Sequence, residues 1–459
     1  MSALERCPTG IEGFDAVTRG GFVRGSLILL AGHPGTGKST FAAKFVYEGA
    51  VRYGEPGVYV SLTEPRDRFY AYMKGLGIDL EEAERRGLLR YLSLPTAVSR
   101  EVINTFVEAV LKAVDEVKAR RVVIDPLTPF IQLGAPIEAR SLLHDVLMNL
   151  CHLLKATVLV VADLPFGEAK IGYGAEEFVA DAVMMLKLRY SEEGVVRRQL
   201  ELVKMRGVPL TTLVYEYSIE PGEGFVLHQP LAVAEAKVDV RERLSTGVEG
   251  LDAIFGGGII RGTTTLVVGP SGSGKTLLAL TMAAENAMRG LKVHYATFEE
   301  PISQVRATLE ALGYDPDELS KRGLTIASVP PWKSSPGVVR LTLNKAFIKH
   351  GLGRDLAVID GVSALKRALG DRAFLEVTHE AMGFFKSHGM TAVVCLAEDY
   401  FKERRATMDT MMDNIIALRL SLEPGGLRRG LVVVKSRMGL ADSREHEVVL
   451  LKGRPVVKP

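Results

Sequence analysis

The sequence carries two copies of one long segment, and this repeat constrains the fold more than any other feature. Residues 5–39, ERCPTGIEGFDAVTRGGFVRGSLILLAGHPGTGKS, recur 237 positions later as residues 242–276, ERLSTGVEGLDAIFGGGIIRGTTTLVVGPSGSGKT. Each copy continues with a helix-length stretch, an acidic turn and an apolar run that ends in aspartate. The repeat therefore predicts two homologous domains of about 225 residues each.

The joint between the copies is expected at about residue 235. Pro221, Gly222, Gly224 and Pro230 interrupt the chain shortly before the second copy opens, and such residues mark loops and linkers. We therefore expect one domain over 1–235 and a second over 236–459.

The fold class follows from the alternation of apolar runs and amphipathic stretches within each copy. Short runs rich in Val, Ile and Leu, such as TVLVVA at 157–162, are typical of parallel strands covered on both faces. The runs 199–205 and 212–217, and likewise 430–435 and 446–451, lie too close together for a crossover helix, so they predict antiparallel hairpins. The prediction is an α/β protein of two tandem domains, each a mainly parallel sheet flanked by helices and ending in hairpins.

Two phosphate-binding loops are expected, GHPGTGKS at 32–39 and GPSGSGKT at 269–276. Each follows an apolar run and opens a helical stretch, the context that separates such a loop from an ordinary glycine-rich turn. Glycines let backbone N–H groups surround phosphates, the lysine reaches the terminal phosphates, and the final hydroxyl can bind magnesium. ATP and Mg²⁺ are the predicted cofactors. The predicted loop residues are Gly32, Pro34, Gly35, Thr36, Gly37, Lys38, Ser39 and Thr40, and Gly269, Ser271, Gly272, Ser273, Gly274, Lys275, Thr276 and Leu277.

Two aspartates are further candidates for the magnesium sites. Asp125 ends RVVID and Asp360 ends LAVID, at the strand edge where the loops are also expected. A carboxylate there can hold the ion together with Ser39 or Thr276. The alternative is an aspartate that merely caps the end of a strand.

Several motifs together resemble the KaiC-like ATPases of the RecA superfamily, in a doubled form that covers nearly the whole chain. They are TGxxGxD before each loop (9–15 and 246–252), the paired acidic turns, EEFVADAV at 176–183 and KMRG at 204–207. The resemblance implies RecA-like domains, and subunits that form a homohexameric ring with ATP between neighbours.

The acidic turns are SLTEP at 61–65 and FEEP at 298–301. In ATPases of this kind such a turn supplies the base that orients the attacking water. Glu299 and Glu300 fit this role, and Glu64 matches Glu300, but Thr63 stands where the second copy has Glu299. We therefore expect hydrolysis mainly in the second domain. Solvated acidic loops are the alternative.

Two cation pairs have the form K-x-R on expected strands: Lys204 with Arg206, and Lys435 with Arg437. Strand alternation places both side chains of a pair on one face. The resemblance implies that they reach the γ-phosphate bound by the neighbouring subunit, where cations stabilise developing charge. A solvated pair on an edge strand is the alternative.

Two other functions remain open. A recombinase-like DNA-binding ATPase would use the dibasic pairs Arg404-Arg405 and Arg428-Arg429, although the net charge of +2 and the absence of a basic stripe argue against nucleic acid. A kinase that phosphorylates itself would use Thr410, which matches an acceptor threonine of clock proteins in the resembled family. Asp409 replaces the preceding acceptor serine, so we do not expect a circadian oscillator.

The expected location of the protein in the cell is inferred from the sequence signals for membranes and secretion. The sequence has no apolar run of about 18 residues and no signal-peptide pattern, so we expect a cytoplasmic protein that uses no membrane. Three widely spaced cysteines without a CxxC motif predict small buried side chains rather than metal or redox chemistry. A regulatory protein partner is expected, but nothing in the sequence identifies it.

Overall fold

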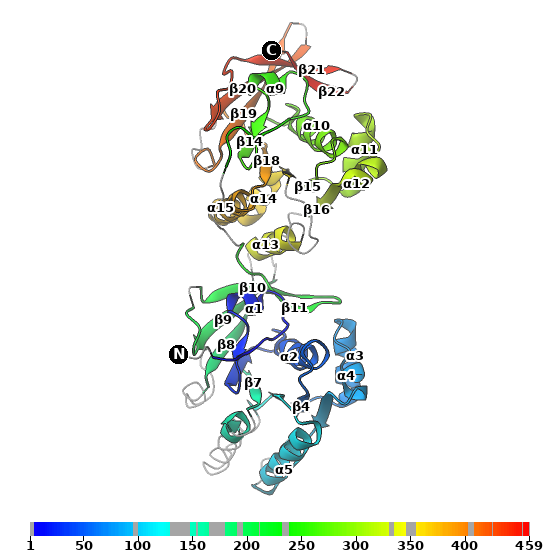
Figure 1. Cartoon of the computed structure of the whole chain (residues 1–459), viewed down its shortest axis with the longest axis vertical. Coiled ribbons are helices and arrows are strands. Elements are labelled where there is room, and N and C mark those ends of the chain that lie inside the picture. Colours follow the sequence, from blue (N-terminus) through cyan, green and yellow to red (C-terminus); the bar gives the residue numbers. More distant parts are fainter. Residues whose placement is uncertain are drawn as a thin grey trace. The chain divides into compact units, whose positions relative to one another are not determined.

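The chain consists of two compact units, Met1–Gln229 and Pro230–Pro459 (Figure 1). The computed structural model describes residues 4–94, 100–128, 147–152, 155–164, 180–190, 196–210, 212–231, 238–329, 335–345, 355–402, 408–424, 426–451 and 453–458. The expected joint at about residue 235, the pair Arg404-Arg405 and residues 176–179 of the EEFVADAV motif lie outside the described residues.

The first unit contains a nine-stranded sheet with the strand order β11-β10-β9-β8-β3-β7-β6-β4-β5. The strands from β5 to β8 in this order are parallel, and β8 to β11 form antiparallel hairpins. Their bounds are β3 Leu27–Gly32, β4 Gly57–Ser61, β5 Leu89–Ser93, β6 Arg121–Asp125, β7 Thr157–Asp163, β8 Ala182–Tyr190, β9 Val196–Met205, β10 Val214–Glu220 and β11 Gly224–Leu227.

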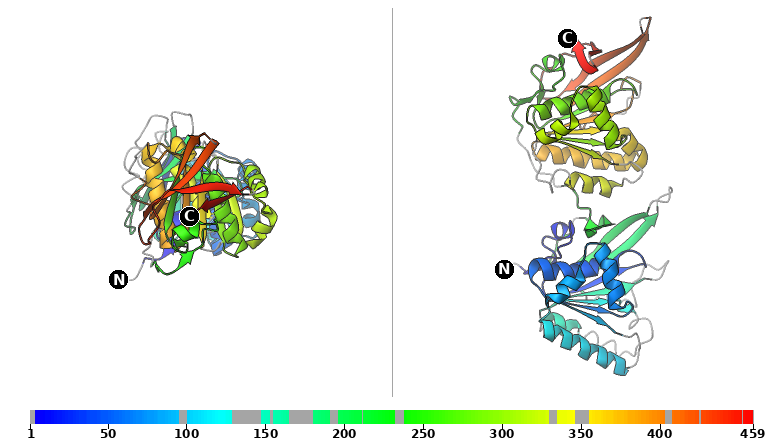
Figure 2. Two further views of the ribbon diagram at one scale, coloured as in Figure 1. Left: turned by 90° about the horizontal axis from the view of Figure 1, so that it is seen from above. Right: turned by 90° about the vertical axis from the view of Figure 1, so that its right-hand side faces the viewer.

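Both faces of this sheet are buried, which explains its continuous apolar strands. In β3, Ile28 and Leu30 join one core cluster, whereas Leu27 and Leu29 join another on the opposite face. Figure 2 (right) shows helices on both faces of the sheet. The helices are α1 Phe14–Val17, α2 Lys38–Tyr53, α3 Arg66–Gly75, α4 Leu80–Arg85 and α5 Arg100–Val117, and a small ribbon pairs β1 Arg6–Cys7 with β2 Phe22–Val23.

The second unit repeats this design with the strand order β16-β15-β17-β18-β14-β19-β20-β21-β22. Strands from β16 to β19 in this order are parallel, and β19 to β22 are antiparallel. The strands are β12 Arg243–Leu244, β13 Ile259–Ile260, β14 Thr264–Val268, β15 Val293–Thr297, β16 Leu324–Ser328, β17 Leu356–Asp360, β18 Thr391–Leu396, β19 Asn414–Glu423, β20 Gly426–Ser436, β21 His446–Leu451 and β22 Arg454–Lys458. The helices are α9 Leu251–Ile254, α10 Lys275–Met288, α11 Ile302–Ala311, α12 Pro316–Arg322, α13 Pro336–Asn344, α14 Val362–Leu369 and α15 Asp371–Ser387.

These two units confirm the predicted fold class of tandem RecA-like domains, with mostly parallel sheets and terminal antiparallel hairpins. None of the helices that the structure describes is long and apolar enough to cross a membrane.

The TGxxGxD motif forms the same tight turn in both units. The Asp15 carboxylate accepts hydrogen bonds from the backbone N–H of Thr9 at 2.8 Å and from its hydroxyl at 2.6 Å, and Asp252 binds Thr246 in the same way. At Gly13, where φ is 81°, a Cβ would lie 2.0 Å from the Leu227 carbonyl oxygen. The motif therefore has a structural role, which is to dock the N-terminal turn of each unit against its last strand.

Candidate functional site

Each predicted phosphate loop joins the C-terminal end of a central strand to a helix, β3 to α2 and β14 to α10. The residues that precede the two helices, Gly37 and Gly274, have φ of 91° and 100°, a conformation that favours glycine. Neither helix has a side-chain cap at its N-terminus. The first N–H groups of α2 and α10 therefore remain available to a bound phosphate.

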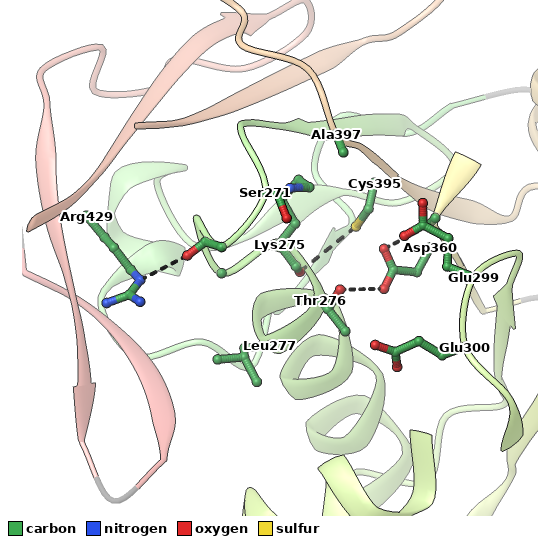
Figure 3. Close-up of a pocket in the computed structure, with 13 residues that line it drawn as sticks. Ser271, Lys275, Thr276, Leu277, Glu299, Glu300, Asp360, Cys395, Ala397 and Arg429 are labelled. Atoms are coloured by element: carbon green, nitrogen blue, oxygen red, sulfur yellow. Dashed lines mark hydrogen bonds between the residues drawn. The ribbon is translucent and has the colours of Figure 1, made fainter. Parts of the chain in front are cut away.

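In the second unit the loop borders a cavity of about 310 Å³ (Figure 3). This volume is within the range of small-molecule sites. Residues from the loop, the acidic turn and the ends of β17 and β18 meet there. The lining residues are Ser271, Gly272, Gly274, Lys275, Thr276, Leu277, Glu299, Glu300, Asp360, Gly361, Cys395, Ala397 and Arg429.

The structure brings each candidate magnesium ligand next to its partner. The Thr276 hydroxyl donates to the Asp360 carboxylate at 2.8 Å, and the Tyr295 hydroxyl binds the same oxygen at 2.9 Å. In the first unit Ser39 and Tyr59 both hydrogen-bond Asp125. Burial removes water from the Asp125 carboxylate and so raises the pKa of this group.

These oxygen ligands fit a magnesium ion that is also held by phosphates. Mg²⁺ prefers hard oxygen donors and commonly uses only one or two protein groups beside a nucleotide. Within the described part of the chain no three His, Cys, Asp or Glu residues are placed to hold a metal on their own. The hydroxyl and carboxylate of each unit could hold the ion only together with oxygens from a nucleotide or water.

The acidic turns have the same backbone geometry in both units. The N–H groups of Glu299 and Glu300 lie 3.2 Å from the Thr297 hydroxyl, and those of Thr63 and Glu64 approach Ser61 similarly, at 3.4 and 3.0 Å. The hydrogen bonds of the two turns correspond residue by residue, and in this correspondence Thr63 takes the position of Glu299.

The two glutamates of the acidic turn in the second unit, Glu299 and Glu300, have different environments. The carboxylate of Glu299 lies 3.5 Å from the exposed guanidinium of Arg367. Burial, followed by the nearby carboxylates of Asp360 and Glu299, raises the pKa of Glu300. Its Oε2 atom, like Oε2 of Glu64, is buried without a hydrogen-bond partner among the described residues. Both carboxylates line the cavity, and which of them acts as the base stays a prediction.

The two loop lysines are both buried but differ in their contacts. Lys38 donates to the carbonyls of Gly32 and His33 at 2.9 Å and pairs with Asp163 at 2.9 Å. Lys275 donates to the carbonyl of Pro270 at 2.9 Å, and burial lowers the pKa of its ammonium group.

The K-x-R pairs lie at the opposite edge of each sheet from the loops. Lys435 is near the end of β20 and Arg437 lies one residue beyond it; residue 436 pairs with 414, at the start of β19. Lys435 Nζ donates to the Met412 carbonyl at 2.7 Å, and Arg437 to the Thr410 carbonyl at 3.1 Å.

The first unit repeats this placement. Lys204 lies in β9, Arg206 follows the strand, and Arg206 pairs with Asp181 at 3.1 Å. In both units the lysine and arginine of the K-x-R pair therefore lie at the sheet edge far from the phosphate loop of the same unit.

From the sequence, Arg429 was considered only as part of a dibasic pair for DNA, and its place at the cavity, at the other end of β20, was missed. Its Nε atom is 3.4 Å from the Gly272 carbonyl, and its side chain lines the cavity. The preceding Arg428 pairs with Glu423 at 3.2 Å. An RR dipeptide occurs at both 197–198 and 428–429, six residues before each lysine of the K-x-R pairs, and this repeated spacing could have indicated the site.

Comparison with known proteins identifies the family. The family model for the KaiC ATPase matches residues 7–232 and again residues 244–454. The chain belongs to the KaiC family of ATPases. The circadian clock oscillator protein KaiC of Thermostichus vulcanus is 28% identical over 97% of this chain and 88% of its own length. That of Prochlorococcus marinus is 29% identical over 99% of this chain and 93% of its own length.

A shorter match is closer in sequence. The circadian clock protein KaiC2 of Synechocystis sp. is 34% identical over 68% of this chain and 56% of its own length. Membership of this family implies that the chain binds and hydrolyses ATP, in agreement with the two loops.

Proposed function

We propose that this KaiC-family ATPase forms a homohexameric ring in which ATP and Mg²⁺ lie between neighbouring subunits, with hydrolysis mainly in the second domain. The boundary between the two domains along the chain would lie at about residue 235. The observation that carries the proposal is the convergence of Lys275, Thr276 and Asp360 with the acidic turn around one cavity. These groups supply what phosphoryl transfer needs: a phosphate cradle, a metal ligand and a carboxylate base.

Within this site each group has a distinct part. The N-terminal N–H groups of α10 and the Lys275 ammonium bind the phosphates. Thr276 and Asp360 would hold Mg²⁺, which would supply positive charge to the phosphate oxygens. Glu299 orients the attacking water and accepts its proton. In the first domain Lys38, Ser39 and Asp125 would have the corresponding roles toward ATP and Mg²⁺, whereas Thr63 supplies no carboxylate for the chemical step.

The cation pairs complete the site from the neighbouring subunit. Lys435 and Arg437 are held at the sheet edge opposite the loop of their own domain. That placement supports action on a different subunit's ATP, where they would stabilise the charge that develops on the γ-phosphate. Lys204 and Arg206 would have the same role for the first domain.

Hydrolysis by the second domain is tested by steady-state ATPase assays of Glu299→Gln and its neighbour Glu300→Gln. We expect Glu299→Gln to reduce the rate by about 10²–10⁴-fold, the usual contribution of acid–base catalysis. Near wild-type turnover in Glu299→Gln, with loss in Glu300→Gln, would instead assign the base to the second position, which the first domain retains as Glu64. Both domains would then carry the base, and hydrolysis would not be expected mainly in the second.

Ring formation is tested by light scattering of the full chain with and without MgATP. We expect a shift from small species to a hexamer, because nucleotide at an interface favours the closed assembly. A particle mass that does not respond to ATP would contradict the proposal. We expect a regulatory protein to be the partner of such a ring.

Kinase activity is tested separately, by mass spectrometry after incubation with ATP. Phosphate on Thr410 would show that the chain also phosphorylates itself.

A further inference from the structure

The phosphate-loop lysine of the first domain is neutralised by a carboxylate that lies outside the loop. Lys38 Nζ is 2.9 Å from Asp163 Oδ1, and it donates to the carbonyls of Gly32 and His33 at the same distance. These three partners match the three N–H donors of an ammonium group. The Lys38 side chain is 7% exposed and that of Asp163 is 42% exposed, so the pair joins a buried ammonium group to a partly solvated carboxylate.

The sheet fixes the position of Asp163. Strand β7 lies between β3 and β6, and its register sets Asp163 directly beside Gly32, where the phosphate loop begins. The Asp163 N–H donates to the Thr128 hydroxyl at 2.7 Å, and the following N–H, of Leu164, donates to the Gly32 carbonyl at 3.0 Å. The carboxylate therefore starts from an anchored backbone next to the loop.

The second domain lacks this carboxylate. Val268 pairs with Leu396, so Ala397 follows β18 at the position that Asp163 occupies at the end of β7. Ala397 lines the same cavity as Lys275. At this strand position the first site therefore has a carboxylate and the second has none.

We propose that Asp163 is a specificity-determining residue of the first nucleotide site, where its carboxylate holds Lys38 until the phosphates of a bound nucleotide displace it. The lysine serves the β- and γ-phosphates, so ATP and ADP must break the ion pair and AMP need not. Asp163 consequently raises the concentration at which nucleoside di- and triphosphates fill the first site, and in a ring held together by that site it sets the nucleotide level required for assembly. This inference rests on the proposed function of the loop as an ATP site.

The effect is measurable as a difference between nucleotides. A close ion pair with one buried and one half-exposed partner exceeds the small contribution of fully exposed pairs, and we expect its removal to change affinity about tenfold. Equilibrium binding is measured for ATPγS, ADP and AMP with Mg²⁺ on full-length Lys275→Ala, in which the first site is the competent one. Adding Asp163→Ala, which copies Ala397, should tighten ATPγS and ADP about tenfold and leave AMP unchanged.

The second domain provides the matched control. In a Lys38→Ala chain, Ala397→Asp should weaken ATPγS binding at the second site by a similar factor. Asp163→Asn, which keeps the shape of the side chain, should behave as Asp163→Ala. If Asp163→Ala unfolds the chain, the Asp163→Asn and Ala397→Asp variants decide.

Three results would overturn the inference: equal or weaker ATPγS binding in both Asp163 variants, equal tightening of AMP, or no effect of Ala397→Asp. Failure of Lys275→Ala to bind any ATPγS is a different outcome, because it would refute the first loop as an ATP site.

Discussion

The topology of β20 makes Arg437 unable to act on the ATP of its own domain. Arg429 contacts the phosphate loop through the Gly272 carbonyl, and Arg437 lies eight residues further along the chain, just past the end of the same strand. At about 3.3 Å per residue that separation is about 26 Å. An arginine side chain spans roughly two Cα–Cα spacings, or about 8 Å. Arg437 must therefore act on another subunit if it acts on ATP at all.

Mixing two inactive variants tests this directly. Arg437→Ala should lower turnover by about 10³-fold or more, the usual effect of removing a cation that stabilises the transferring phosphoryl group. Lys275→Ala should be inactive in its own second site yet still provide Arg437. In rings mixed at equal amounts, roughly a quarter of the interfaces join an intact pocket to an intact Arg437, so we expect about a quarter of the wild-type rate.

The matched control mixes Lys275→Ala with Asp360→Asn. Both changes damage the pocket that a subunit contributes to its own ATP site, so no interface of the mixed ring has an intact pocket and no activity should return. Absence of activity in demonstrably mixed Lys275→Ala and Arg437→Ala rings would refute catalysis between subunits. Recovery in the control pair would refute the assignment of pocket residues to their own domain.

Three further variants have definite expected outcomes. Thr63→Glu should raise turnover by the Glu299→Gln chain, because it restores a carboxylate at the matching turn position; an unchanged rate would count against the comparison of the two turns. Burial raises the pKa of Asp125, so the native state holds this proton more tightly than the unfolded state and loses stability as pH rises through the range between the two pKa values. Asp125→Asn should therefore raise the free energy of unfolding of the nucleotide-free chain at pH 7, and by less at pH 4; an equal effect at both pH values would contradict this. Arg121 is fully buried, pairs with Glu55 at 2.6 Å and donates to the carbonyls of Phe45 and Pro8 at 2.8 Å, so Arg121→Leu should cost about 3–5 kcal/mol in chemical denaturation. Adding Glu55→Leu should not recover this loss, because Arg24 would lose this partner, which lies at 2.5 Å; recovery in the double variant would show that a single unpaired carboxylate is the cause.

The sequence predicted the features that depend on local pattern. Alternating apolar and amphipathic runs predicted the parallel sheets, and the short gap between 430–435 and 446–451 predicted an antiparallel hairpin. The loop motif also predicted the strand-to-helix setting of Lys38 and Lys275. These features depend on residues that are near one another in the chain, so a single sequence contains the information.

Contacts between distant strands could not be predicted in the same way. Asp163 meets Lys38 only because β7 pairs with β3, and Tyr295 reaches Asp360 only because β15 pairs with β17. Asp163 also follows an apolar run, as Asp125 does, but strand order decides which aspartate faces the lysine and which faces the loop hydroxyl. The same applies to Arg429, whose contact with Gly272 depends on β20 returning beside β19.

Each half of the chain is expected to hold one ATP, and calorimetric stoichiometry with ATPγS and Mg²⁺ measures this most directly. The wild-type chain should bind two molecules, and Lys38→Ala and Lys275→Ala should each bind one, because each variant removes the main side-chain charge on the terminal phosphates of one site. Two molecules bound by Lys275→Ala, or one bound by the wild-type chain, would contradict the account.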